Sequence, residues 1–203
     1  MILGLTGSIG CGKSTVGKIL VARGWYGFDA DQVCRGLWNP PDAKVKTAIV
    51  SAFGTELFDN QGQLCREKIA DAVFSDPEKM TKWLAILYPL LESKMTSAID
   101  FCRRQKLDGV FEIPLLFENN YRRFFDKVMM VWAPENIRFE RLQRFRGMQK
   151  EEILRRQSLQ LDCDSKLEMA DFGIINDQDE KYLISQINAF LKMTDKLHYC
   201  IEE

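Results

Sequence analysis

The stretch that decides the fold lies near the start of the chain and reads Gly7-Ser8-Ile9-Gly10-Cys11-Gly12-Lys13-Ser14. It fits the pattern G-x-x-x-x-G-K-[ST], the P-loop, whose glycines let backbone N–H groups converge on a phosphate. An apolar run over residues 2–5 precedes the motif, and a helical pattern over about residues 13–23 follows it. A P-loop needs this context, because the amino terminus of the helix that follows the loop also attracts phosphate. A chance match in a glycine-rich turn is therefore the weaker interpretation.

Each residue type in the motif has a task. Lys13 is predicted to place its ammonium on the β- and γ-phosphates of ATP, and the Ser14 hydroxyl is predicted to be a ligand of Mg²⁺. The predicted phosphate site comprises the whole run from Gly7 to Ser14 together with Thr15. The motif alone leaves open whether the protein is a kinase, an ATPase or a GTPase.

Around the motif, short apolar runs alternate with longer segments of helical periodicity, which is typical of α/β proteins with a parallel sheet. Strands are predicted at residues 2–5, 25–28, 109–113, 127–132 and 172–175. The predicted fold class is therefore the three-layer α/β P-loop fold, in which helices flank a five-stranded parallel sheet.

Between residues 31 and 109 the strand pattern disappears. Helices are predicted there at about 42–53, 66–74 and 77–102. The whole stretch between the two strands is too long for an ordinary crossover connection, which indicates a helical insertion. We predict one domain with a core (about 1–32, 105–133 and 170–203), an insertion (about 33–104) and a lid region (about 134–169). A last helix is predicted at about 180–192, and residues 193–203 show no clear pattern.

Composition excludes several classes of function. Lysine plus arginine (28) nearly balance aspartate plus glutamate (29), so no overall charge favours nucleic acid or an anionic membrane. The six cysteines form no Cys-x-x-Cys pair and there is one histidine, so a disulfide framework or a zinc site is not expected. The start of the chain leaves no room for a signal peptide, and a cytoplasmic location is expected.

Two groups of carboxylates are placed for phosphoryl transfer. Asp29 and Asp31 follow the second strand, at the sheet edge where ligands bind in such folds. One of them, with Asp31 favoured, is expected to accept the proton of an acceptor hydroxyl. The alternative interpretation is that one of them only caps the following helix. Glu112, at the end of the third strand, is either a Mg²⁺ ligand through water or a glutamate at the edge of the core.

The segment after residue 134 is rich in arginine. Most of these side chains are expected to be solvated, but Arg141 and Arg144 share a helix face and are predicted to close over the phosphates as a lid.

The tripeptide Asp171-Phe172-Gly173 and the D-x-x-G match at Asp59 are interpreted as coincidences, since the motifs that accompany them in kinases and GTPases are absent. Cys11 has two readings: a reactive thiol exposed in the empty site, or a small inert residue turned away from ATP.

The chain resembles the dephospho-coenzyme A kinase family over most of its length. The resemblance is carried, in order, by residues 4–16, Asp-Ala-Asp at 29–31, Phe-Gly at 53–54, Gly-Gln-Leu-Cys-Arg at 62–66, Val-Phe-Ser-Asp at 73–76, Leu-Tyr-Pro at 87–89, Ile-Pro-Leu-Leu-Phe-Glu at 113–118, Arg141-x-x-Arg144 leading to Gln157, and Ala170-Asp171 with Ile174 and Asn176.

This resemblance implies ATP-dependent phosphorylation of the ribose 3′-hydroxyl of dephospho-coenzyme A (dephospho-CoA), the final step of coenzyme A synthesis. It implies that the insertion grips the acceptor and that the second helical segment is a lid. The acceptor site implied by similarity consists of Thr6, Asp29, Asp31, Arg66, Leu115, Leu116 and Glu118. The chain departs from the family at Tyr88, Ser8 and Cys65, and the Tyr88 change puts a polar contact of the insertion in doubt.

Two other functions remain to be distinguished. One is a different small-molecule kinase, such as one acting on a nucleoside monophosphate, although the signature at 113–118 favours the coenzyme A precursor. The other is a P-loop ATPase that binds nucleotide to control a partner. The expected substrates are ATP and dephospho-CoA, with Mg²⁺, and the expected assembly is a monomer or a small homo-oligomer.

Overall fold

The computed structural model describes residues 1–37, 41, 43–74 and 76–199. Nothing is described of the side chains of residues 66, 67, 70, 74, 77 and 195–199. Residues 42, 75 and 200–203, which the sequence analysis covers, lie outside the described residues. The chain divides into one unit of residues 1–28 and 102–203 and a second unit of residues 29–101.

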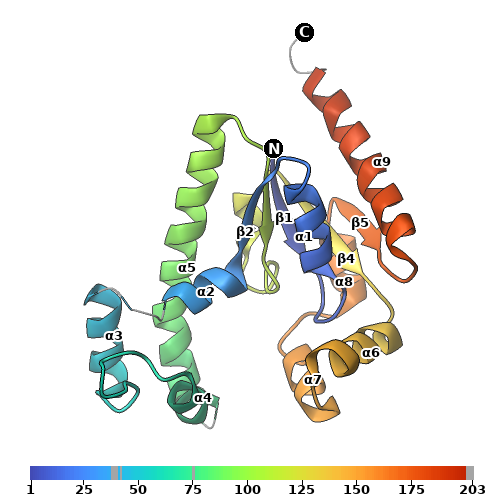
Figure 1. Cartoon of the computed structure of the whole chain (residues 1–203). Helices are drawn as coiled ribbons and strands as arrows, with labels where there is room; N and C mark the ends of the chain where they lie inside the picture. Colours follow the sequence, from blue (N-terminus) through green and yellow to red (C-terminus); the bar gives the residue numbers. More distant parts are fainter. Residues whose placement is uncertain (38–40, 42, 75, 200–203) are drawn as a thin grey trace. The chain divides into compact units, whose positions relative to one another are not determined.

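The described residues form a five-stranded sheet in the order β2-β3-β1-β4-β5 (Figure 1). Its strands are β1 (Ile2–Thr6), β2 (Tyr26–Asp29), β3 (Gly109–Glu112), β4 (Lys127–Trp132) and β5 (Phe172–Ile175). β1 pairs in parallel with both β3 and β4, and β4 pairs in parallel with β5. The predicted strands are confirmed within one residue at their ends. Trp25 does not start β2 because its N–H bonds to Leu20 O, in the turn that closes the preceding helix.

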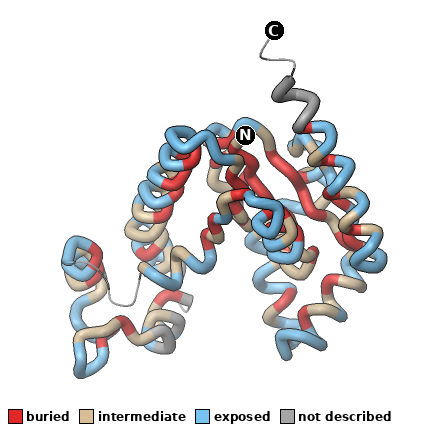
Figure 2. Tube along the Cα trace, turned by 45° about the horizontal axis from the view of Figure 1, so that its top comes forward, coloured by how far each residue is buried: buried red, intermediate tan, exposed pale blue. Residues whose placement is uncertain are grey.

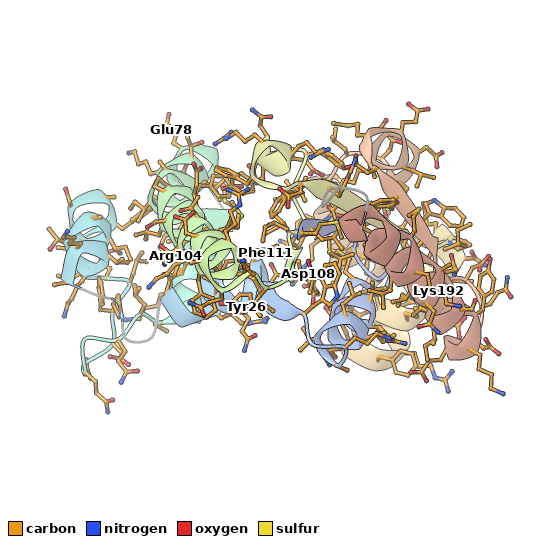
Figure 3. All side chains as sticks on the ribbon, turned by 90° about the horizontal axis from the view of Figure 1, so that it is seen from above. Tyr26, Glu78, Arg104, Asp108, Phe111 and Lys192 are labelled. Atoms are coloured by element: carbon orange, nitrogen blue, oxygen red, sulfur yellow. The ribbon has the colours of Figure 1, made fainter. Side chains whose placement is uncertain are left out.

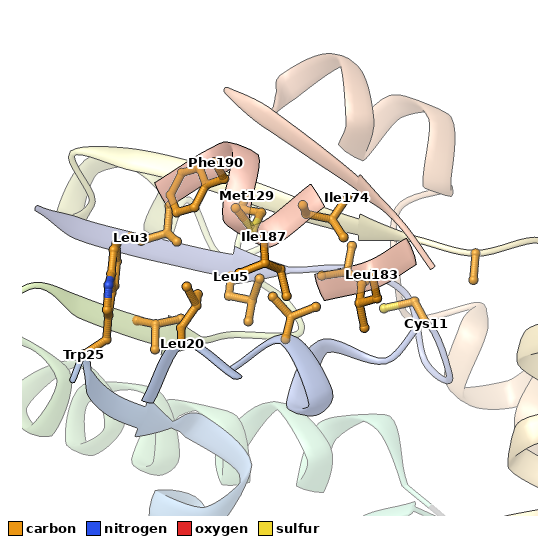
Figure 4. Packing of buried hydrophobic residues seen from close by; sticks show 14 residues of the cluster. Leu3, Leu5, Cys11, Leu20, Trp25, Met129, Ile174, Leu183, Ile187 and Phe190 are labelled. Atoms are coloured by element: carbon orange, nitrogen blue, oxygen red, sulfur yellow. The ribbon is translucent and has the colours of Figure 1, made fainter. Parts of the chain in front are cut away.

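One face of this sheet is covered by α1 (Lys13–Val21) and α9 (Glu180–Tyr199). Leu183, Ile187 and Phe190 repeat at helical spacing on α9 and pack in the same core as Leu3 and Leu5 of β1 (Figure 4). β1 is buried at all of its residues, as expected for a central strand covered on both faces (Figure 2). α9 runs to Tyr199, so the predicted end at residue 192 was wrong.

Aromatic side chains fill the other face. Phe111 of β3 stacks on Phe28 at 5.2 Å between ring centroids and also contacts Phe125. Tyr26 lies beside Phe111, and its backbone N–H donates to Asp108 O at 2.8 Å (Figure 3). This edge of the sheet is therefore fixed by backbone pairing and by aromatic packing together.

The segment between β4 and β5 is helical, as predicted. It contains α6 (Glu135–Arg146), α7 (Lys150–Gln157) and α8 (Cys163–Met169). Gly147 ends α6 with φ at 61°, a conformation that favours glycine at a helix terminus. Asp162 caps α8 by accepting the N–H groups of Asp164 and Ser165. A short 3₁₀ helix, η1 (Tyr121–Phe124), precedes β4.

The second unit has a core of its own. Its helices are α2 (Ala30–Leu37), α3 (Ala43–Phe53), α4 (Arg66–Phe74) and most of α5 (Pro77–Gln105). Ile49, Trp83 and Leu57 are among the residues buried in it. Asp76 caps α5 through the N–H groups of Glu78 and Lys79, as its place before proline predicts. α2 was not predicted as a helix of its own, because it follows β2 without a loop.

None of the helices in the described part of the chain is long and apolar enough to cross a membrane.

Candidate active site

The P-loop joins the end of β1 to the start of α1, and β1 lies between β3 and β4 in the sheet. Gly12, which precedes the helix, has φ at 94°, and a side chain at this position would collide with the Asn176 amide. The Gly12 carbonyl then accepts the N–H groups of Thr15 and Val16. Both the backbone conformation and the lack of space therefore require glycine at this position. The amino terminus of α1 lies directly after the loop, where its unpaired N–H groups can bind phosphate.

Lys13 and the two residues after it lie in the first turn of α1. The Lys13 ammonium donates to Gly7 O at 2.7 Å and to Ser8 O at 3.2 Å, so it is held across the loop. Ser14 and Thr15 are exposed. A cation and a free hydroxyl are therefore next to the loop N–H groups, which is what binding of phosphate and Mg²⁺ requires.

Cys11 is fully buried and belongs to the core under α1 and α9. A buried thiol of this kind packs as a small apolar side chain. The reading of Cys11 as a thiol exposed in the empty site is therefore wrong, and its burial favours the other reading, a small inert residue.

A chain of contacts connects Arg141 of α6 to the phosphate loop through Asn176. The Arg141 guanidinium donates to Asn176 O at 2.9 Å. The buried Asn176 side chain in turn donates from Nδ2 to Cys11 O at 2.9 Å. Asn176, which follows β5, thus fixes the Cys11–Gly12 part of the loop and holds Arg141 beside it.

Replacing Asn176 with alanine should leave the buried Cys11 carbonyl unpaired and remove the long bond from Arg141 to Asn176 Oδ1 at 3.5 Å, while the bond from Arg141 to the Asn176 backbone carbonyl is kept. We expect this to destabilise the protein by about 1–3 kcal/mol and to raise the KM for ATP by roughly tenfold. Thermal unfolding and initial rates would measure both effects. The matched control is Asn136→Ala on the exposed surface of α6, and an unchanged KM for ATP in the Asn176 variant would contradict this role.

The other arginines of α6 differ in environment. Arg138 is buried and donates to Ala133 O and to Ile9 O, so it fastens α6 to the phosphate loop. Arg144 is exposed, lies 4.0 Å from the Glu140 carboxylate and packs over the Phe145 ring. In this structure Arg144 touches no residue of the phosphate loop among those described, and its closure over phosphates stays a prediction.

Glu112 ends β3 beside Leu5 of β1. A side chain at Gly17 would collide with the Glu112 carboxylate, so this carboxylate lies against α1 one turn after Lys13 and Ser14. Hydroxyl and carboxylate oxygens are the donors that Mg²⁺ prefers. Ser14 and Glu112 therefore fit a Mg²⁺ ion that is shared with the nucleotide phosphates. Among the described residues no group of three or more acidic, histidine or cysteine side chains could hold a metal on its own.

The residues assigned to the acceptor by resemblance fall into different environments. Thr6 is buried and its hydroxyl donates to Pro114 O at 3.4 Å. Leu116 is also buried, packed where a side chain at Gly4 would lie, whereas Leu115 is partly exposed. Glu118 is partly buried. The Arg66 side chain lies outside the described part of the chain, although its backbone begins α4.

Asp29 caps a helix, and the catalytic role of Asp31 stays a prediction. The Asp29 carboxylate accepts the N–H of Gln32 at 3.0 Å and so caps α2, while Asp31 is exposed in the first turn of that helix. Burial, followed by the charges of Asp31 and Asp29, raises the pKa of the nearby Cys34 thiol to about 12. Cys34 is therefore a neutral, unreactive thiol at neutral pH.

Comparison with known proteins decides the family. The model of the family described as dephospho-CoA kinase matches residues 1–181. The chain belongs to the dephospho-CoA kinase family. The predicted resemblance, the P-loop kinase fold and the activity, ATP-dependent phosphorylation of dephospho-CoA, are thereby confirmed.

Relatives and solved structures agree with this assignment. A dephospho-CoA kinase from Bdellovibrio bacteriovorus is 34% identical over 197 residues, covering 96% of both chains. Another from Methylococcus capsulatus is 31% identical over 194 residues, covering 93% of this chain and 94% of its own. A crystal structure from Thermus thermophilus is 28% identical with a TM-score of 0.79, covering 95% of this chain and 97% of its own. A dephospho-CoA kinase from Campylobacter jejuni, at 21% identity and TM-score 0.74, shares the fold, covering 97% of this chain and 98% of its own.

The discounted motifs of this dephospho-CoA kinase family member have structural roles. Asp171 accepts the N–H of Val128 at 2.7 Å and pairs with Arg122 and Lys127. It lies before β5 and beside the start of β4, at the opposite end of these strands from the phosphate loop. Asp59 accepts the N–H groups of Gln61 and Gln63 and so shapes a turn.

Sequence reasoning missed four residues that contact the site. Asn176 was matched to the family without a role. Gln160 accepts the N–H of Ile9 at 3.0 Å, the Cys163 sulfur lies 2.8 Å from the Ser8 hydroxyl, and Lys166 pairs with Glu118. Asn176, Gln160 and Cys163 lie more than 150 residues from these partners in the chain, and Lys166 lies 48 residues from Glu118, so local pattern carried no signal of these contacts.

Proposed function

We propose that this kinase transfers the γ-phosphoryl group of ATP to the ribose 3′-hydroxyl of dephospho-CoA, which yields coenzyme A and ADP. The family match carries this proposal, because it includes both the phosphate loop and the loop 113–118 that resembles the acceptor side of the family. A phosphoryl acceptor and a phosphoryl donor are then bound by one chain. A cytoplasmic location follows from this role in coenzyme A synthesis.

The donor side is proposed to work by positioning and charge. The loop N–H groups from Gly7 to Ser14 hold the phosphates, and Lys13 neutralises the charge that develops on the transferred group. Ser14 would hold Mg²⁺ directly and Glu112 through water; when bound, the ion neutralises the phosphate oxygens. The exposed Ser14 hydroxyl and the carboxylate against Gly17 support this assignment.

The acceptor side is proposed to depend on Asp31. Its carboxylate would orient the 3′-hydroxyl and take its proton as the oxygen attacks phosphorus. Asp31 is exposed, and Asp29 is already engaged as a helix cap, which supports Asp31 over Asp29. The unit of residues 29–101, including Arg66, is proposed to bind the rest of dephospho-CoA.

A lid is proposed to exclude water. Arg141, held by Asn176 beside the phosphate loop, would contact the phosphates first, and Arg144 would follow by rotation of its exposed side chain. Without such a lid, ATP would be hydrolysed in place of transfer. The lid is assigned to residues 134–169.

An acceptor panel tests the function. Dephospho-CoA, and not AMP, shikimate or a nucleoside, should raise ADP formation well above the basal rate in the presence of Mg·ATP. Equal stimulation by AMP would favour a nucleoside monophosphate kinase. Slow ADP formation that no acceptor changes would favour an ATPase that controls a partner.

A further inference from the structure

Lys166 of α8 is a fully buried lysine beside the site. Its ammonium lies 2.7 Å from Glu118 Oε1 and donates to Pro114 O at 3.1 Å. Glu118 Oε1 also accepts the N–H of Leu161 at 2.8 Å. Lysine is almost never buried completely without such partners, because removing its charge from water is costly.

These contacts join two loops. Pro114 and Glu118 are both in the loop that follows β3, and the Pro114 carbonyl accepts the Thr6 hydroxyl as well as the Lys166 ammonium. Lys166 ends a short segment, residues 160–166, that also contacts the phosphate loop. Gln160 accepts the N–H of Ile9, and Cys163 of α8 lies against Ser8. The segment 160–166 therefore contacts both the phosphate loop and the loop 114–118. Lys166 provides the positive charge that pairs with Glu118 in the second of these contacts.

The net effect of its surroundings is to lower the pKa of Lys166 below its ordinary value, and burial is the largest cause. Burial lowers the pKa of Lys166 and the positive charge of Lys13 lowers it further, whereas the hydrogen bond and the charge of Glu118 raise it. The second Glu118 oxygen, Oε2, is buried without a hydrogen-bond partner among the described residues. A buried ion pair of this kind is weak evidence for stability, because a neutral pair of similar size often stabilises a fold equally well.

We propose that Lys166 is a positioning residue, which acts through Glu118 and Pro114 to hold the loop 114–118 in place against the phosphate loop during phosphoryl transfer. The inference rests on the proposed function, since it takes this loop to face the acceptor. Lys166 itself is fully buried, so we assign it no contact with either substrate. Its effect is on the alignment of the acceptor with the phosphate loop, where small displacements cost large factors in rate.

The test compares three variants: Lys166→Met, Glu118→Gln and the double variant with both changes. Lys166→Met leaves the Glu118 carboxylate unpaired and should lower Tm by roughly 10 °C. The double variant contains no buried charge at this place and should melt near the unaltered protein. Its kcat with dephospho-CoA should nevertheless stay roughly 10- to 100-fold low, with a raised KM for dephospho-CoA and a KM for ATP changed by less than about threefold.

Lys127→Met is the matched control, because Lys127 pairs with Asp171 at the opposite end of the strands, and it should keep the kcat of the unaltered protein. Recovery of both Tm and kcat in the double variant would show that the pair only supports the fold and would overturn the inference. A double variant that melts as low as Lys166→Met would overturn it in the same way. If the unaltered protein shows no stimulation by dephospho-CoA, the proposed function fails first, and this inference with it.

Discussion

Replacing Lys13 with alanine is expected to reduce kcat for phosphoryl transfer by roughly 10²- to 10³-fold or more, because it removes the cation that stabilises the developing charge on the phosphates. The fold should remain intact. The Lys13 side chain is only partly buried, and the bonds it loses are to the carbonyls of Gly7 and Ser8 on the loop. Initial rates with Mg·ATP and dephospho-CoA, together with Tm, would measure the two quantities.

Lys18→Ala is the matched control, since Lys18 is an exposed lysine further along the same helix. It should change neither kcat nor Tm appreciably. A Lys13 variant with near-normal kcat would mean that phosphate is bound somewhere other than this loop.

Replacing Asp31 with asparagine is expected to lower kcat by roughly 10²- to 10⁴-fold while leaving the KM for ATP nearly unchanged, because the amide cannot take the proton of the acceptor hydroxyl. The side chains are similar in size, and Asp31 is exposed. Little change in Tm is therefore expected. Steady-state rates at varied ATP and at varied dephospho-CoA would separate the two KM values from kcat.

Asp29→Asn is the control two residues away. Asparagine caps helices about as well as aspartate, so the bond to the Gln32 N–H and the start of α2 should be kept. This variant should retain most of the activity. If Asp29→Asn is the damaging change and Asp31→Asn is mild, the two roles have been reversed.

The sheet and the phosphate loop could be predicted from local sequence, because each of their signals lies within a few residues. Buried strands such as β4 are short and continuously apolar, and the glycines before Lys13 specify one backbone shape. The start of α2 was harder to recognise, since no turn residue separates it from β2. The end of α9 was misjudged because its pattern fades before the helix stops.

The candidate site was predictable only in part. Arg138, Arg141 and Arg144 share one helix face, yet Arg138 is buried, Arg141 is bonded to Asn176 and Arg144 is exposed. Helical spacing cannot distinguish these environments, because they depend on what packs against α6. Lys166 was missed for the same reason: its partner Glu118 lies 48 residues earlier in the chain, and only the folded structure brings the two together.

This protein is proposed to transfer phosphate from ATP to one particular hydroxyl, so the decisive measurement is the position of the phosphate in the product. Dephospho-CoA would be incubated with the protein and Mg·ATP, and phosphorus–proton NMR would identify the carbon that carries the new phosphate. We expect a phosphate on the ribose 3′-oxygen and one ADP for each product molecule. A phosphate on another oxygen, or ADP formed together with free phosphate and unchanged dephospho-CoA, would contradict this proposal.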